Sequence, residues 1–194
     1  MKRRKSLALT VSLAALAAMI GVATPPVVAE STRSLSSADT VLAAAPTAAW
    51  IAEGRGKRIV YIFIDANCPS CALLYRNLRT LIEPQDLQIR WVPVAVVSAT
   101  SLGKAAAILQ ASDRLAALRH NEERFRGESY SGGIEEDIPT AETEQKLRTN
   151  ERLLNTLDIP VVPSMLFAGK DGRAVLIQGA LSPLAQRKVF AHLP

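Results

Sequence analysis

Two cysteines separated by two residues, Cys68 and Cys71, constrain this chain more than any other feature. The run before them, residues 58–65, is short and rich in β-branched and aromatic side chains, which predicts a buried central strand. The run after them, residues 69–82, has leucines at helical spacing and ends before Pro84, which predicts a helix. The pair is therefore expected where a buried strand passes into a helix.

A helix that begins at Cys68 favours thiol chemistry there. The first N–H groups of a helix lack partners within it, and the positive end of its dipole favours an anion, so the Cys68 thiolate is stabilised. Pro69 suits the first helical position. Cys71 lies one turn further on, near enough to form a disulfide, and is expected to be less exposed. Cys68 would then attack a substrate disulfide, and Cys71 would resolve the mixed disulfide.

Two other uses of the cysteine pair are weaker hypotheses. A purely structural disulfide would close a very short loop, which stabilises a fold by only about 2 kcal/mol in the chain-entropy model. A structural zinc ion needs four ligands, and only His120 and His192 could join the pair. Both histidines are more simply explained as solvent-facing helix residues. We therefore expect neither a metal nor an organic cofactor.

The order of the predicted elements favours an α/β fold. Residues 87–97 predict a second strand, with Pro93 at a bend or edge, so the first half gives strand, helix and strand as in a parallel α/β sheet. Residues 48–53 are typical of the last turns of a short helix. Residues 100–157, rich first in Ala and Leu and then in charge, predict a helical insertion.

The last part of the chain predicts a hairpin followed by a helix. Residues 164–168 and 174–178 are apolar runs, and Gly172 between them suits a turn that needs a positive φ. A final helix is expected over residues 183–192, because a serine and a proline stand at its start. We expect a single domain over residues 48–194.

Residues 1–29 have the layout of a secretory signal peptide. Four basic residues precede an apolar run, and residues 27–29 (Val-Val-Ala) provide the small side chains of a cleavage site, which we place after Ala29; cleavage after Ala23 is the alternative. An uncleaved anchor is a second alternative, although the run is short for a membrane span of about 20 residues. Residues 30–47, rich in Ser, Thr and Ala, predict a linker or tether.

Export would place the chain in the periplasm, an oxidising compartment where disulfides persist. Loss of the signal peptide removes four basic residues and no acidic ones, so the formal net charge falls from +5 to 5 − 4 = +1. A chain this close to neutral gives no indication of a nucleic-acid partner. We expect its partners to be exported proteins with cysteines and a membrane redox partner that donates or accepts electrons.

The succession of strand, C-x-x-C helix, strand, helical insertion and proline-led hairpin resembles the thioredoxin superfamily. Within it, the chain is most similar to the periplasmic DsbC/DsbG disulfide isomerases. The resemblance lies in four stretches: Ile59–Asp65, Asn67–Cys71, Asn150–Leu154 and Pro163–Gly179. It implies a thioredoxin-like fold and an enzyme that exchanges thiols and disulfides.

The resemblance also implies roles for residues around the pair. It implies a cis peptide bond before Pro163, with Pro160 as the competing candidate. It places Val162 beside the sulfurs, where its backbone would pair with an extended substrate segment. Pro69 and Ser70, between the cysteines, would support the site.

Three departures from the family pattern bear on function. Residues 30–47 are too few for the N-terminal dimerisation domain of these isomerases, so we expect a monomer. Val162 stands where the isomerases usually have threonine and is similar to the DsbA oxidases. Ile62 stands where thioredoxins and DsbA have a buried acid. Asp65 matches the DsbC/DsbG pattern instead, either to tune Cys68 or relay a proton, or simply as a soluble residue at a strand end.

Three functions stay open on the sequence. The first is a reductase or isomerase that acts on disulfides of exported proteins and is kept reduced by a membrane electron donor. The second is a DsbA-like thiol oxidase, which Val162 favours. The third is a chaperone or secretion-system accessory with secondary redox activity, which the insertion at residues 100–157 favours.

Overall fold

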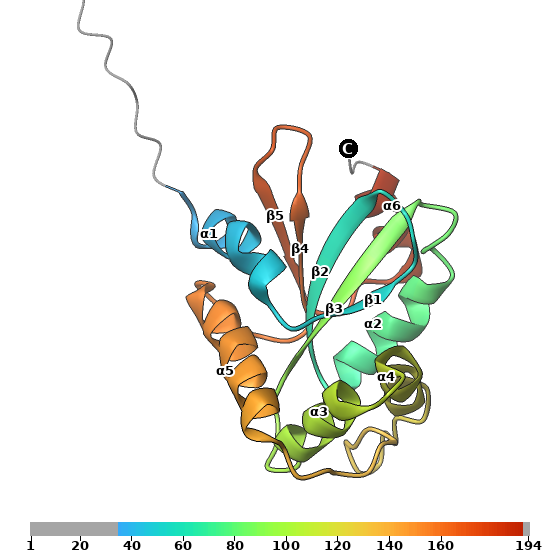
Figure 1. Cartoon of the computed structure of the whole chain (residues 1–194). Coiled ribbons are helices and arrows are strands. Elements are labelled where there is room, and N and C mark those ends of the chain that lie inside the picture. The colour runs from blue at the N-terminus through green and yellow to red at the C-terminus, as the bar shows by residue number, and fades with distance from the viewer. Residues whose placement is uncertain (1–34, 192–194) are drawn as a thin grey trace, which may run out of the picture. The chain divides into compact units, whose positions relative to one another are not determined.

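A mixed sheet of five strands organises the described part of the chain, residues 35–191, in the computed structural model (Figure 1). In order across the sheet, the strands are β1 (Ile51–Glu53), β3 (Leu87–Val94), β2 (Arg58–Asp65), β4 (Ser164–Ala168) and β5 (Ala174–Gln178). Strand β2 is central, parallel to β3 and antiparallel to β4, and the edge strands β1 and β5 are antiparallel to their neighbours. The described residues all lie in one compact unit.

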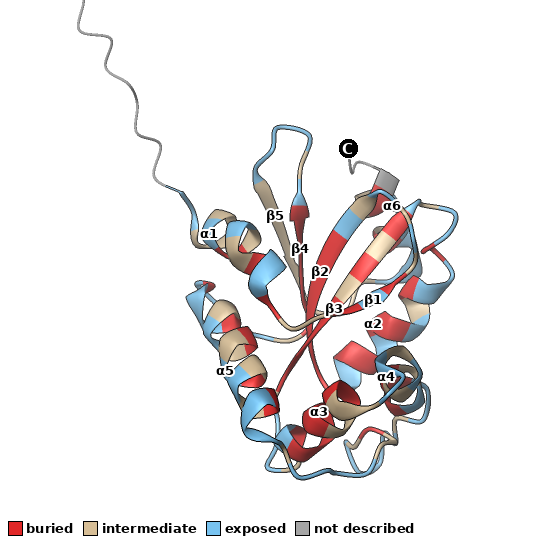
Figure 2. Ribbon diagram, viewed as in Figure 1, coloured by how far each residue is buried: buried red, intermediate tan, exposed pale blue. Residues whose placement is uncertain are grey.

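Strand β2 is buried on both faces, as its continuous apolar run predicts. Val60, Ile62 and Ile64 belong to one hydrophobic cluster, whereas Tyr61 and Phe63 belong to another. Successive side chains of a strand point to opposite faces, so each cluster lies on its own face of the sheet. Figure 2 shows the consequence: the central strands are buried along most of their length.

Helices cover both faces of this sheet. The first face packs against α2 (Pro69–Arg79), α3 (Ser101–Gln110), α4 (Arg114–Glu123) and α6 (Pro183–Ala191). The second face packs against α1 (Ser37–Ala44), a short 3₁₀ turn (Ala45–Thr47) and the end of α5 (Ala141–Thr156). Helix α5 contributes Leu147 to the first cluster and Leu154 to the second.

Most of the predicted elements are confirmed. Strands β2, β4 and β5 have the predicted bounds, and α2 joins the parallel pair β2 and β3. The predicted insertion contains the three helices α3, α4 and α5. Gly172 lies in the turn between β4 and β5 with φ of 76°, a conformation that side-chain-bearing residues rarely adopt. The β-hairpin pairs with the strand–helix–strand unit through β4 and β2. Because this pairing is antiparallel, the end of β2 lies beside the start of β4.

The helix predicted to end at residues 48–53 is wrong. Ile51–Glu53 is strand β1, paired with β3 so that Ile51 lies opposite Trp91. Ile51 and Glu53 are buried and Ala52 is exposed, the alternation expected of a strand. Three residues are too few for this alternation to be recognised in a sequence.

The linker predicted for residues 30–47 is wrong over its described part. Ser36 and Asp39 form a capping box that starts α1. Val41 and Ala45 are fully buried, and Asp39 Oδ1 accepts a hydrogen bond from the Ala174 N–H at 2.7 Å. Small side chains gave this segment no obvious periodicity, but they let its backbone pack closely against the sheet.

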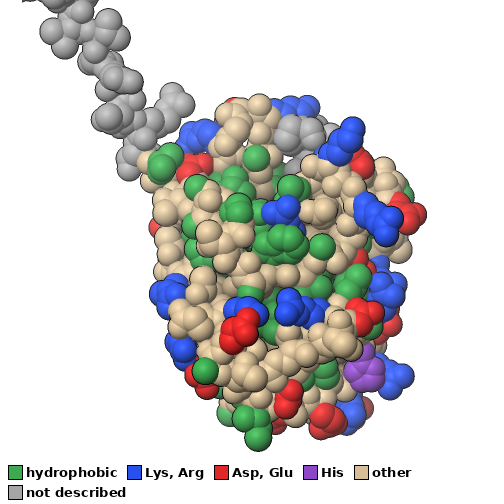
Figure 3. All heavy atoms as spheres, viewed as in Figure 1, with side chains coloured by type: hydrophobic (Ala, Val, Ile, Leu, Met, Phe, Trp, Pro, Cys, Tyr) green, Lys and Arg blue, Asp and Glu red, His purple; other side chains and the backbone are tan. Residues whose placement is uncertain are grey.

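The predicted signal peptide, residues 1–29, and the start of the predicted linker lie outside the described residues. Within residues 35–191, none of the helices has the length and apolar character needed to span a membrane. On the face shown in Figure 3, basic and acidic side chains are interspersed, with hydrophobic side chains between them.

Candidate active site

Cys68 occupies the N-cap position of α2, directly after β2, as the sequence predicts. Its sulfur accepts a hydrogen bond from the Cys71 N–H at 3.1 Å, which satisfies one of the N–H groups that a helix start leaves free. Pro69 is at the first helical position, where no N–H is needed. Pro69 and Ser70 are both exposed at the surface. Both cysteines are free thiols.

The cis peptide bond implied by the family resemblance is present between Val162 and Pro163. This confirms Pro163, and not Pro160, as the cis-proline. The Cys68 thiol donates to the Val162 carbonyl, with 3.7 Å between sulfur and oxygen. Residues far apart in the chain, one at the start of α2 and one just before β4, therefore lie side by side.

The two cysteines differ slightly in exposure, and Cys68 is less open than a reactive cysteine at a helix start would suggest. Cys68 is 4% exposed and Cys71 is fully buried. The expectation that Cys71 is the less exposed of the two is confirmed. The small opening at Cys68 means that an incoming disulfide has a restricted approach, past the exposed Pro69 and the backbone at Val162.

The environment separates the acidities of the two thiols. A hydrogen bond from the Cys71 side chain, helped by the Cys71 and Ser70 backbone N–H groups, holds the pKa of Cys68 below its ordinary value, against burial and the nearby Asp65. Burial, with the neighbouring Cys68, raises the pKa of Cys71. The thiolate therefore forms first on Cys68, and thiolate is the nucleophilic form of cysteine.

Asp65 is fully buried, so the interpretation as a soluble strand-end residue is wrong. Its Oδ2 accepts from the N–H groups of Val96 and Val97 at 2.7 and 2.9 Å. Its Oδ1 accepts from the Asn67 N–H and the Ser101 hydroxyl, both at 2.8 Å. Asp65 thus fixes the loop after β3 and the start of α3 against the segment that leads to Cys68.

Asn67 is a structural residue of the site that the sequence did not single out. It is 1% exposed, and the two hydrogens of its Nδ2 are shared among three hydroxyl groups within hydrogen-bond distance, those of Ser98, Thr100 and Ser101. Its Oδ1 accepts from the Gly132 N–H at 3.3 Å. These bonds join the segment before Cys68 to two loops of the insertion, and only folding brings those loops together.

Glu122 is a second residue that the sequence did not indicate. It lies in α4 and is fully buried. Its Oε1 accepts from Asn121 Nδ2 at 3.0 Å, whereas Oε2 has no hydrogen-bond partner. Burial raises its pKa to about 8, and the charges of Cys68 and Asp65 act in the same direction. In the sequence, Glu122 stands in a charged stretch that is typical of an exposed helix face.

A groove of about 740 Å³ lies beside the cysteine pair. Asn67 and Pro69 form one wall, and the loop after β3, with Val97, and the loop around Tyr130 form the others. Tyr130 is 66% exposed, and so its ring is available to a bound chain. Lys104 fixes the loop around Tyr130, because its Nζ donates to the carbonyls of Gly132 and Ile134 at 2.6 and 2.8 Å.

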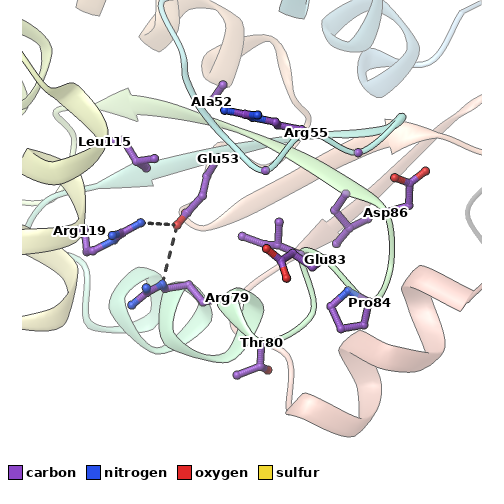
Figure 4. A pocket seen from close by; sticks show the side chains of 14 residues that line it. Ala52, Glu53, Arg55, Arg79, Thr80, Glu83, Pro84, Asp86, Leu115 and Arg119 are labelled. Atoms are coloured by element: carbon purple, nitrogen blue, oxygen red, sulfur yellow. Dashed lines mark hydrogen bonds and ion pairs between the residues drawn. The ribbon is translucent and has the colours of Figure 1, made fainter.

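A larger hollow, about 1140 Å³, lies at the opposite end of α2 and contains neither cysteine (Figure 4). Glu53 points into it between Arg79 and Arg119, and its carboxylate pairs with both guanidinium groups. Trp91 Nε1 also donates to Glu53 at 2.9 Å. These bonds tie β1 to α2 and α4, and they account for the buried acid at this position.

The fold and this site together define the chain as a member of the thioredoxin-like family. The model of the thioredoxin-like domain matches residues 46–193.

Among proteins with assigned functions, the chain is similar to the thiol:disulfide interchange protein DsbG of Pseudomonas aeruginosa. The two are 31% identical over 137 residues, which cover 70% of this chain and 52% of the relative. DsbG of Escherichia coli (strain K12) is 28% identical over 127 residues, covering 63% of this chain and 49% of the relative. The chain thus spans about half the length of these curated relatives.

Solved structures show the same fold at lower sequence identity. The catalytic domain of Proteus mirabilis ScsC is 20% identical, with a TM-score of 0.60 over 78% of this chain and 95% of that domain. A periplasmic thioredoxin-like protein of Salmonella enterica serovar Typhimurium is 18% identical, with a TM-score of 0.59 over 73% of this chain and 88% of that one.

Proposed function

We propose that this protein is a periplasmic thiol–disulfide oxidoreductase that acts on exported proteins, as a reductase or isomerase. The observation that supports it most directly is the difference in acidity and burial between the two cysteines. Cys68 has a lowered pKa and lies beside the Val162 carbonyl, whereas Cys71 is buried with a raised pKa. The similarity to DsbG supports the same activity.

In the proposed reaction, the Cys68 thiolate attacks one sulfur of a substrate disulfide. A Cys68–substrate bond forms, and the other substrate sulfur leaves as a thiolate that takes a proton from water. Cys71 then attacks Cys68, which forms the Cys68–Cys71 disulfide and releases the second substrate thiol. The substrate is reduced and the protein is oxidised by the same two electrons.

The residues around the pair have proposed supporting roles. The backbone at Val162, held by the cis bond to Pro163, binds an extended substrate segment beside Cys68 in the manner of an added strand. Pro69 and Ser70 form the exposed rim, and Asp65 holds the adjoining loop.

The proposed setting includes export by a signal peptide over residues 1–29 and a membrane partner that returns the protein to the dithiol form. The protein acts as a monomer in this proposal. Its substrates are exported proteins with cysteines, and no cofactor takes part.

A second candidate is a DsbA-like oxidase, which donates its disulfide. The lowered pKa of Cys68 favours it, because a stabilised thiolate stabilises the reduced protein and so makes the disulfide more oxidising. Val162 before the cis-proline favours it as well. A chaperone or secretion-system accessory with secondary redox activity is the third candidate.

Trapping with Cys71→Ser in the intact organism tests the proposal. Without the resolving thiol, mixed disulfides should accumulate on Cys68, and mass spectrometry would identify the attached proteins. Cys68→Ser is the matched control and should trap none. Equal recovery from both variants, or none from either, would contradict thiol exchange at Cys68.

The direction of electron flow needs a separate measurement. Acid quenching of cells followed by alkylation should find the parent protein mostly as the dithiol if it is a reductase or isomerase. A mostly oxidised pair would favour the oxidase instead. Full biological activity in Cys68→Ser would favour the accessory module.

A further inference from the structure

The buried carboxyl of Glu122 is unexplained by the packing of α4. An ionised carboxylate in an apolar interior is costly unless it is paired. Glu122 is fully buried, yet its Oε2 has no hydrogen-bond partner and its Oε1 has only the neighbouring Asn121 amide. A buried carboxyl with an unpaired oxygen does not stabilise the fold, so its presence needs another explanation.

The position of Glu122 is fixed relative to the cysteine pair. Asn121, the preceding residue, donates from Nδ2 to the Ala66 carbonyl at 3.0 Å, in the segment that leads to Cys68. Arg76 of α2 donates to the Glu122 backbone carbonyl at 3.3 Å. Helix α4 is therefore held to both the loop before the pair and the helix after it.

The charged and titratable groups that interact electrostatically with Glu122 come from two places outside α4. Cys68 is the N-cap of α2, Cys71 and Arg76 lie within α2, and Asp65 ends β2. Burial is the main cause of the raised pKa of Cys71 and of Glu122. The charge of Glu122 adds to the first shift and the charge of Cys68 adds to the second, so the ionisation of each group affects the others.

The second step of thiol exchange needs a proton acceptor at this place. Cys71 must lose its proton before it attacks, but it is fully buried and so has no contact with bulk water. Asp65 is a poor acceptor, because both of its oxygens already accept hydrogen bonds from four donors. Glu122 has a carboxylate oxygen to spare.

We propose that Glu122 accepts the Cys71 proton during resolution of the mixed disulfide and returns it in the reverse reaction. The inference rests on the proposed thiol exchange. In the mixed disulfide Glu122 first gives up its own proton to solvent. The Cys71 proton then reaches the Glu122 carboxylate through one water molecule, because no hydrogen bond joins the two side chains directly. The Cys71 thiolate forms a bond to Cys68, and the Cys68–substrate bond breaks. The leaving substrate thiolate takes its proton from water, and Glu122 later releases its own.

The electrostatics give this transfer its timing. Burial is the main cause of the raised pKa of Glu122, and while Cys68 is a thiolate its negative charge raises this pKa further, so the carboxyl holds its proton. When Cys68 becomes part of a mixed disulfide, that charge disappears. Glu122 then ionises more readily, at the step in which Cys71 has to give up a proton.

The test is a stopped-flow reaction of the reduced protein with 5,5′-dithiobis(2-nitrobenzoate). Attack by Cys68 releases one chromophore, and resolution by Cys71 releases the second, so the two steps are seen separately. In Glu122→Gln we expect the second phase to slow by on the order of 10²-fold at pH 7, the usual size of an acid–base contribution. The first phase should change much less.

The pH profile separates proton transfer from a general effect on packing. The second phase of the parent should show an inflection at or below the Glu122 pKa of about 8, and Glu122→Gln should lack it. Glu123→Gln, at the adjacent and exposed position, is the matched control and should keep both the rate and the inflection. Circular dichroism checks the fold of each variant.

The outcomes distinguish this inference from the proposed function. If the parent releases neither chromophore, thiol exchange itself fails. If the parent and Glu122→Gln release the second chromophore at the same rate and with the same pH profile, only the role of Glu122 is overturned. If Glu122→Gln does not fold, the parent decides: absence of an inflection at or below about pH 8 in its second phase overturns the inference.

Discussion

At the scale of the residue, the site depends on a few buried polar groups that have no water to replace a lost partner. Asp65 satisfies four donors and Asn67 joins three hydroxyls, all within the loops that surround Cys68. Hydrogen bonds to a buried charge are among the stronger interactions in proteins, and leaving such a group unpaired is costly. The reactive sulfur therefore rests on a rigid polar support.

Asp65→Asn should destabilise the fold by about 3 kcal/mol. The amide NH2 group cannot accept the hydrogen bonds that one carboxylate oxygen now accepts, so two donors would lose their partner. Urea unfolding measures the change. The control is Asp158→Asn at an exposed position, which should alter stability by less than about 0.5 kcal/mol. Equal effects of the two substitutions would show that the Asp65 network does not stabilise the loops.

Glu122 should make the stability of the protein fall as the pH rises. Its pKa is about 8 in the folded protein against an ordinary 4.5, so its contribution is fully present below about pH 4.5 and is lost as the pH rises through 8. Thermal unfolding of Glu122→Gln and of the parent, from pH 5 to 9, measures this. The variant's melting temperature should rise relative to the parent's over that range, and a constant difference would contradict the raised pKa.

At the scale of the element, α1 is part of the fold. Its capping box, its buried Val41 and the bond from Ala174 to Asp39 attach it to the second face of the sheet. Helix α1 packs in the same hydrophobic cluster as Phe63 of β2. It therefore stabilises the strand that leads to Cys68.

Val41→Ala should lower the free energy of unfolding by about 2 kcal/mol, from lost burial and the cavity left behind. Leu35→Ala, which truncates a side chain 70% exposed just before α1, is the control and should have little effect. Chemical denaturation of both variants provides the comparison. A neutral Val41→Ala would mean that α1 is only loosely attached in solution.

The elements that the sequence predicted well are those with an uninterrupted run of at least five mostly apolar residues or a distinctive motif. Residues 58–65, 164–168 and 174–178 each form the strand expected of them, and the C-x-x-C motif marks the start of α2. Strand β1 was missed because it is three residues long, and α1 because small side chains conceal its buried face. Short or small-residue elements are defined by what they pack against.

The sequence predicted the cysteine pair and the proline loop of the candidate site, but not the buried polar residues around them. Cys68, Cys71, Val162 and Pro163 follow from motif and family resemblance. Glu122 could not be found in this way, since a glutamate among other charged residues has the pattern of a solvated helix face. Its burial depends on how α4 packs against α2, which no local pattern records.

At the scale of the whole molecule, the chain is tightly packed at its centre and less so at one edge. Strands β2, β3 and β4 are buried, whereas every residue of β5 is only half-buried. The loop around Tyr130 lies at the surface beside the cysteine pair. Stability is therefore expected to be uneven, and lowest in the loop around Tyr130 that borders the groove beside the cysteine pair.

Hydrogen exchange should reveal this gradient. The amides of β2 and β3 should exchange slowest, those of β5 faster, and those of residues 126–131 fastest among these segments. Lys104→Met, which removes the donor beneath this loop, should accelerate exchange there and leave β2 unchanged. Lys146→Met on the exposed side of α5 is the control. Uniform protection across these segments would contradict the gradient.

The recessed position of the Cys68 sulfur has a consequence for client selection. With 4% of Cys68 accessible, the proposed exchange would be slower for a disulfide held inside a rigid, folded domain, which cannot bend toward the sulfur. One carried by a loose or unfolded stretch can bend into the gap. Under the proposed function, flexibility around the substrate disulfide would then favour reaction more than any particular sequence around its cysteines.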